Sequence, residues 1–136
     1  KFNRMCAELG CPLVPGADTY FSLVSASLRV GLCTSNVRSA VKRLLGEYSC
    51  FETLDTVVTS EDVTHSKPSP EGFLLLATRL DVQPERCIVF EDSLAGLKAA
   101  RSAGMRTVGV THRCADLAGV RALADQTVTD YRELLG

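Results

Sequence analysis

Several features that mark membrane or nucleic-acid-binding proteins are missing from this 136-residue sequence. No apolar run approaches the ~20 residues that a membrane-spanning helix needs. The formal net charge is only −1, so we expect neither nucleic acid nor a membrane as a partner. The sequence also has no internal repeat and no low-complexity segment. What remains, 46% hydrophobic and 23% charged residues, is typical of one globular domain with its own core.

The chain also lacks any clustering of cysteine and histidine. Its six cysteines are scattered and form no Cys-x-x-Cys pair, and the only histidines are His65 and His112. A zinc site would need clustered ligands at short spacing. Cys33 and Cys87 fall in or beside apolar runs, where a free thiol packs as a small hydrophobe. We therefore expect reduced thiols and a cytoplasmic protein.

Strand-like and helix-like segments alternate along the chain. Runs of β-branched and apolar residues predict strands over residues 28–33, 53–59, 87–90, 106–110 and 127–128. Helical spacing and end signals predict helices over residues 17–27, 35–45, 69–80 and 94–104, with a last helical turn over 131–135. Such alternation predicts an α/β fold with a mainly parallel sheet flanked by helices, in which ligands bind beyond the carboxyl ends of the strands.

The first polar cluster, Thr34-Ser35-Asn36, directly follows a predicted strand. Its hydroxyl and amide groups, with the free N–H groups of a helix start, could hold phosphate oxygens. The same residue types are also the preferred N-caps of helices, so for this cluster taken alone ordinary capping is the favoured interpretation.

The second cluster surrounds Lys67, which precedes Pro68 and Pro70 in a stiff loop. A lysine there could neutralise phosphate charge, although a lone lysine is more often a solvated surface residue. We assign the neighbouring His65 to the surface, without a partner.

The third cluster, Glu91-Asp92, ends an apolar strand. Two carboxylates at the end of a buried strand are costly unless they are paired, and a hard cation such as magnesium accepts oxygen ligands. The alternative, that Asp92 caps the next helix, explains one of the two acids. A second acidic pair, Glu61-Asp62, also follows a strand, so the dipeptide by itself is a weak signal.

Taken in order, these clusters form a recognisable set. Thr34-Ser35-Asn36, the stretch from Lys67 to Phe73 and the stretch from Ile88 to Gly96 together closely resemble the haloacid dehalogenase-like hydrolases. The nearest branch is the phosphoglucomutase and phosphoglycolate phosphatase group, and the resemblance runs from about Pro12 to the end.

This resemblance implies a Rossmann-like core and magnesium-dependent phosphoryl transfer on a small phosphorylated metabolite. It makes Thr34 and Lys67 catalytic, and it gives phosphate binding to Thr34, Ser35, Asn36 and Lys67. Asp92 would bind Mg²⁺ directly and Glu91 largely through water. Catalysis in the family passes through an aspartyl-phosphate, which splits one displacement into two.

The departure from the family lies at the nucleophile. The family's Asp-x-Asp motif on a central strand has no counterpart, because no aspartate here lies two residues from another. We expect residues 1–11 to be the remnant of a helical cap segment and residues 12–136 to be a core that lacks its first strand. The missing part would lie upstream of Lys1, and that segment or another copy of the chain would complete the sheet. Alternatively, the chain is a non-catalytic remnant that binds phosphate or a protein.

Overall fold

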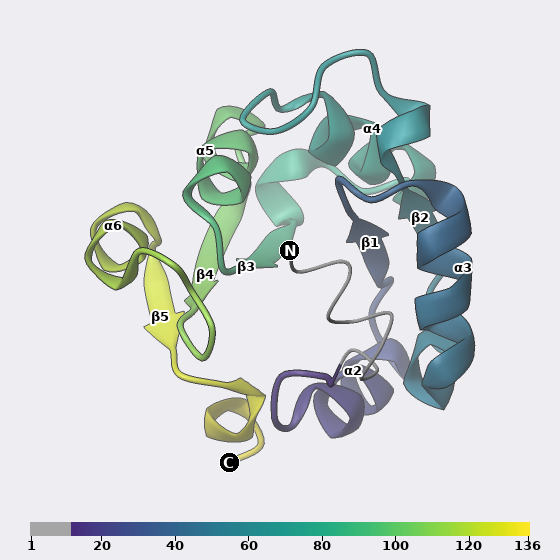
Figure 1. Ribbon diagram of the computed structural model, residues 1–136, viewed down its shortest axis with the longest axis horizontal. Helices are drawn as coiled ribbons and strands as arrows, with labels where there is room; N and C mark the ends of the chain where they lie inside the picture. Colours follow the sequence, from purple (N-terminus) through teal and green to yellow (C-terminus); the bar gives the residue numbers. More distant parts are fainter. Residues whose placement is uncertain (1–11) are drawn as a thin grey trace.

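The computed structural model describes residues 12–136, so the expected cap remnant over residues 1–11 lies outside the described residues. Helices and strands alternate along the chain (Figure 1). The helices are α2 (Ala17–Ser25), α3 (Arg38–Glu47), α4 (Glu71–Leu80), α5 (Leu94–Ser102) and α6 (Leu117–Leu123). The strands are β1 (Gly31–Cys33), β2 (Thr56–Val58), β3 (Ile88–Glu91), β4 (Arg106–Val110) and β5 (Gln126–Val128). Short 3-10 turns are η1 (Ser49–Thr53), η2 (Ser60–Asp62), η3 (Pro84–Arg86) and η4 (Tyr131–Leu134).

The strands form two parallel sheets rather than one. β1 pairs with β2, and β3-β4-β5 form the second sheet, so the predicted α/β class with parallel strands is confirmed. Within residues 12–136, no backbone ladder joins β1 to β3. This break falls between the strand ending at Cys33 and the strand ending at Glu91, where the family resemblance places a further strand. The two sheets face each other across it in Figure 1.

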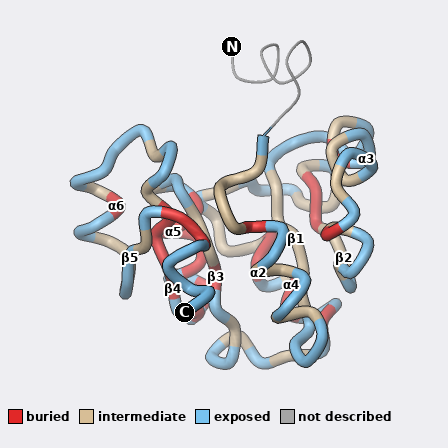
Figure 2. Tube along the Cα trace, turned by 90° about the horizontal axis from the view of Figure 1, so that it is seen from below, coloured by how far each residue is buried: buried red, intermediate tan, exposed pale blue. Residues whose placement is uncertain are grey.

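Helix α4 holds the two sheets together through two apolar stripes. Phe73 and Ala77 pack in one cluster with Val89 of β3 and with α5. Leu76 and Leu80, three residues further along, pack in another cluster with Val58 of β2. Because residues four apart lie on one face of a helix, each stripe covers one sheet. Figure 2 shows the buried residues concentrated in α5 and beside it, where Leu97, Ala99 and Ala100 have no exposed surface.

A cluster of aromatic rings makes the second connection across the break. Tyr20 of α2 and Tyr131 of η4 both contact Phe90 of β3, with ring centroids 5.6 and 5.5 Å apart. Phe21 of α2 lies 5.3 Å from Tyr131. Burial raises the pKa of Tyr131, and the neighbouring Tyr20 and the acids at the end of β3 add to this effect.

The main differences from the predicted elements are local. Helix α3 begins at Arg38 instead of residue 35, and β1 and β2 are shorter than predicted. A 3-10 turn occupies Ser49–Thr53, which includes the first residue of the second predicted strand. Helix α6 was not predicted, and Asp116 caps it by accepting a hydrogen bond from the Gly119 N–H at 2.8 Å. None of the described helices is long and apolar enough to cross a bilayer. The cysteines of the described part, Cys33, Cys50, Cys87 and Cys114, are free thiols.

Candidate active site

The segment Thr34-Ser35-Asn36 leaves the end of β1 as a loop. The Thr34 N–H donates to the Val58 carbonyl at 2.9 Å, which extends the β1-β2 pairing by one residue. The Asn36 N–H donates to the Thr34 hydroxyl at 3.1 Å. The N-cap of α3 is Val37, whose side chain makes no capping hydrogen bond. The alternative interpretation of these residues as ordinary caps is therefore wrong, and Ser35 is exposed to solvent.

Lys67 is not a solvated surface lysine. Its side chain is only 14% exposed, and its Nζ donates to the Cys33 carbonyl at 3.1 Å and to Glu91 Oε1 at 2.5 Å. The ammonium group also lies 4.9 Å from the centre of the Phe73 ring, within the range of a cation–π contact. Lys67 thus joins the carboxyl ends of β1 and β3 across the break between the sheets.

Glu91 has a full set of donors around its carboxylate. Besides Lys67, its Oε2 atom accepts from the Ser93 hydroxyl at 3.0 Å, from the Ser93 N–H at 3.3 Å and from the Asp92 N–H at 3.2 Å. This position requires glycine at residue 96, because a Cβ atom there would lie 2.1 Å from the Glu91 Cδ atom. The sequence therefore fixes Glu91 through Ser93 and Gly96 of the same motif.

The surroundings of the Asp92 carboxylate differ from those of Glu91. The cap of α5 is Ser93, whose hydroxyl accepts from the Gly96 N–H at 3.1 Å, so the capping interpretation of Asp92 is wrong. Among the described residues, no side chain donates a hydrogen bond to the Asp92 carboxylate. Partial removal from water, then the charge of Glu91, raises its pKa, and the nearby Lys67 charge opposes that effect.

A small pocket of about 20 Å³ lies between the β1 loop and the Lys67 loop. Thr34, Ser35 and Lys67 line it, whereas Asn36 does not. The remaining polar lining, which no sequence motif indicates, comes from Thr59, Ser60, His65 and Ser66. These residues come from the ends of β2 and from the following loop, where polar residues carry no distinctive spacing.

The Lys67 loop is held by Glu71, the first residue of α4. The Glu71 carboxylate accepts from the N–H groups of Thr64 and His65 at 2.7 and 2.8 Å. The exposed His65 ring places its Nδ1 atom 3.0 Å from the same carboxylate, so His65 is on the surface as predicted but does have a partner. These hydrogen bonds keep the pKa of Glu71 below its usual value, and the two from backbone N–H groups have the largest effect. A helix-start acid in a sequence can therefore be read as an anchor for the preceding loop.

The described residues offer only part of a metal site. Glu91 and Asp92 are adjacent carboxylates, and no group of three or more metal-ligand side chains occurs within residues 12–136. Mg²⁺ commonly uses one or two carboxylates and keeps several water molecules, so a pair of this kind fits that ion. The Asp92 carboxylate is the freer of the two to bind an ion, since the carboxylate of Glu91 already accepts four hydrogen bonds.

Comparison with known proteins agrees with the motifs. A model of the haloacid dehalogenase-like hydrolase family matches residues 4–104. The phosphoglycolate phosphatase of Salmonella typhi is 35% identical over 113 residues, which make up 82% of this chain and 45% of that protein. The structure of CbbY from Rhodobacter sphaeroides in complex with phosphate has 31% identity and a TM-score of 0.81, covering 98% of this chain and 60% of that one.

A β-phosphoglucomutase from Clostridium difficile is similar as well, with 29% identity and a TM-score of 0.75, covering 90% of this chain and 52% of that one. The chain spans about half the length of the curated relatives that it matches. With family model, motifs and fold in agreement, this chain belongs to the haloacid dehalogenase-like hydrolases, in the branch that holds phosphoglycolate phosphatases and phosphoglucomutases.

Proposed function

We propose that this chain is the phosphate- and metal-binding core of a magnesium-dependent phosphatase or phosphomutase that acts on a small phosphorylated metabolite. The observation that carries the proposal is the position of Lys67, whose ammonium group contacts Glu91 and the end of β1 beside a pocket lined by Thr34 and Ser35. A cation, hydroxyl groups and carboxylates at one end of a parallel sheet suit a phosphoryl group and its metal.

Each polar residue has a chemical role in this proposal. The Thr34 and Ser35 hydroxyls donate hydrogen bonds to the oxygens of the transferring phosphoryl group, and Asn36 helps from the same loop. Lys67 stabilises the negative charge that these oxygens carry in a loose, in-line transfer. Its contact with Glu91 keeps the flexible lysine side chain aimed at one point, which lowers the entropy that substrate binding must remove.

Mg²⁺ would be held directly by Asp92 and through water by Glu91. The raised pKa of Asp92 supports this assignment, because two like charges that are partly shielded from water favour a nearby cation. When bound, the ion would offset phosphoryl charge. The residues of this chain would orient the phosphoryl group and hold the lysine in place.

These 136 residues contain no Asp-x-Asp motif, so we infer that the nucleophile lies outside them. We propose that a strand from a further N-terminal segment fills the break between β1 and β3 and carries the nucleophile. Another copy of the chain could complete the sheet but would bring no Asp-x-Asp motif. Parallel strands lie about 4.8 Å apart, so one inserted strand needs its two neighbours about 10 Å apart. Lys67 contacts both neighbours and would therefore lie beside the carboxyl end of the inserted strand.

A small-molecule substrate, rather than nucleic acid or a membrane, is supported by the net charge of −1. A cytoplasmic location is supported by the scattered cysteines. A second candidate, a non-catalytic phosphate- or protein-binding remnant, is favoured by the lack of the nucleophile motif within these residues.

The test is the rate of magnesium-dependent hydrolysis of small phosphate monoesters by the full natural chain, together with its intact mass. We expect Lys67→Ala to lower kcat/KM by about a hundred- to a thousand-fold, the usual effect of losing one group aimed at the developing charge. Lys98→Ala, at an exposed lysine of α5, is the matched control and should leave the rate unchanged. Activity of Lys67→Ala at the wild-type level would remove Lys67 from the mechanism. A wild-type chain that binds phosphate without turnover would favour the non-catalytic remnant.

A further inference from the structure

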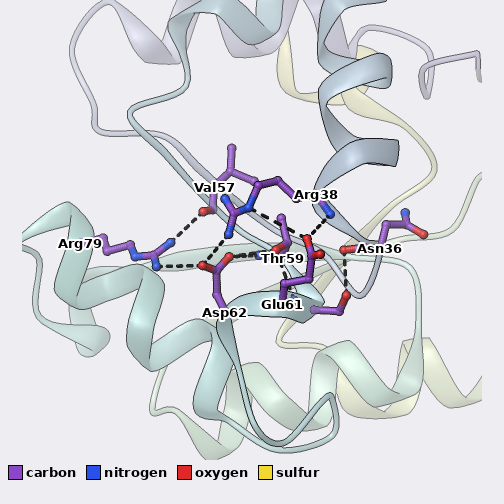
Figure 3. A network of polar contacts seen from close by, with 8 residues as sticks. Asn36, Arg38, Val57, Thr59, Glu61, Asp62 and Arg79 are labelled. Atoms are coloured by element: carbon purple, nitrogen blue, oxygen red, sulfur yellow. Dashed lines mark hydrogen bonds and ion pairs between the residues drawn. The ribbon is translucent and has the colours of Figure 1, made fainter.

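Asp62 in η2 is the centre of a polar network behind the candidate phosphate pocket (Figure 3). Its Oδ2 atom accepts from the Thr59 N–H at 2.8 Å and from the Thr59 hydroxyl at 2.9 Å. Its Oδ1 atom accepts from Arg38 at 2.7 Å and from Arg79 at 3.1 Å. The Asp62 side chain is only 10% exposed, so one carboxylate connects the end of β2, the start of α3 and the last turn of α4.

This network reaches the pocket through the residues next to Asp62. Thr59 is 1% exposed, and both Thr59 and Ser60 line the pocket. Ser60 donates from its N–H at 3.1 Å and from its hydroxyl at 3.2 Å to the Asn36 carbonyl. The Arg38 N–H donates to Glu61 at 2.8 Å. As Figure 3 shows, the η2 turn thereby holds the β1 loop from its far end.

We propose that Asp62 is a positioning residue that fixes the β1 loop, Thr34-Ser35-Asn36, in the geometry that binds phosphate. The proposal rests on the proposed function, because it assigns a task at the same site. A loop that carries small hydroxyl side chains has little packing of its own, since Ser35 and Asn36 are exposed. Its geometry must therefore come from the neighbouring turn, and the charge of Asp62 orients the turn and Arg38 together.

The structure provides a matched control in Asp125. Its carboxylate accepts from the Thr107 N–H at 2.8 Å, from the Thr107 hydroxyl at 2.9 Å and from Arg101 at 3.2 Å. Thr107 is also 1% exposed. The Thr-Asp-Arg arrangement thus recurs beside β4 and β5, away from the residues that line the pocket, with one arginine instead of two and with a 49% exposed Asp125 side chain.

The experiment compares Asp62→Asn with Asp125→Asn in the full natural chain. Each variant keeps its shape and loses one charge. Calorimetry measures the Kd of inorganic phosphate, thermal unfolding measures Tm, and hydrogen exchange measures protection of the Arg38 and Ser60 amides. We expect Asp62→Asn to raise the Kd about tenfold, the lower end of the usual effect of losing a supporting contact. We expect Asp125→Asn to lower Tm without changing the Kd.

Hydrogen exchange keeps this test separate from the test of the proposed function. If the wild-type chain fails to bind phosphate, the proposed function fails, while the loop-positioning role is still tested by amide protection. Faster exchange of Arg38 and Ser60 in Asp62→Asn, but not in Asp125→Asn, would support the role. Unchanged protection of these amides in Asp62→Asn, or an equal rise of Kd in both variants, would overturn it.

Discussion

Gly96→Ala is the most discriminating single substitution in the site, because two effects act on it with opposite sign. Residue 96 lies in the first turn of α5, where alanine is a better helix former than glycine by about 0.8–1.0 kcal/mol. Propensity alone therefore predicts a more stable protein. The structure predicts the reverse, since the new Cβ atom would lie 2.1 Å from Glu91 Cδ and 2.3 Å from both carboxylate oxygens.

The expected size of the loss follows from what Glu91 contacts. To avoid the new methyl group, its carboxylate must leave Lys67 and the Ser93 hydroxyl. A hydrogen bond to a charged group contributes about 1.5–3 kcal/mol, and overpacking of a well-filled site costs about 1–3 kcal/mol. With one such hydrogen bond lost, overpacking added and the gain in propensity subtracted, we expect a net destabilisation of about 1.5–5 kcal/mol.

Denaturant unfolding of the full natural chain measures this difference. Gly46→Ala is the control, because Gly46 lies in helix α3 and a Cβ atom there would meet nothing within 4 Å. It should stabilise the protein by up to about 1 kcal/mol. Phosphate affinity should fall in Gly96→Ala, where Lys67 loses its anchor, and should stay constant in Gly46→Ala. If Gly96→Ala were as stable as Gly46→Ala, the described geometry of Glu91 would be wrong.

Two further predictions concern charge. Asp92→Asn should raise the Tm measured without metal at pH 7, because the raised pKa of Asp92 means that its ionised form disfavours the fold. Mg²⁺ should raise the Tm of the wild type but not that of the variant. Hydrogen bonds from Thr59 and Thr107 lower the pKa values of Asp62 and Asp125, so the stability they provide is present above the usual aspartate pKa near 4 and is lost as pH falls through the lowered values. Thermal unfolding from pH 6 to pH 2 should show this loss, and Asp62→Asn should flatten the profile; an unchanged profile in the variant would contradict the assignment.

Much of the fold could be predicted from the sequence because its strongest signals are local. The strand over 106–110 was predicted at its observed bounds, since β4 pairs with β3 and β5 on its two sides and its last three residues, Val108, Gly109 and Val110, form a short apolar run. The start of α3 was predicted three residues early. Ser35 and Asn36 have the composition of a helix start. They form a loop instead, in which the Ser60 hydroxyl donates to the Asn36 carbonyl and the Asn36 N–H donates to the Thr34 hydroxyl. Tertiary contacts there override local preference.

The polar clusters were located by sequence, but their partners were not. The motif around Lys67 is recognisable in the sequence. Its contacts with Cys33 and Glu91, however, depend on how closely the two sheets approach each other. Asp62 was the opposite case. The pair Glu61-Asp62 served in the sequence analysis only to show how weak an acidic dipeptide is, and yet Asp62 accepts hydrogen bonds from two arginines and a buried threonine. Distant arginines that converge on one carboxylate leave no spacing pattern in a sequence.

Because α4 packs on both sheets through its two stripes, the position of the Lys67 ammonium group depends on how the two sheets are packed. The helix starts four residues after Lys67, and Phe73 of its first turn lies under the ammonium group. A substitution that shifts Leu76 against one sheet, or Ala77 against the other, must therefore rotate or displace α4 as a whole. A change of side-chain volume in either hydrophobic cluster would then move the Lys67 ammonium group, even far from the pocket. Sequence changes in the two clusters are therefore coupled. Compensating core substitutions should therefore occur in pairs across α4.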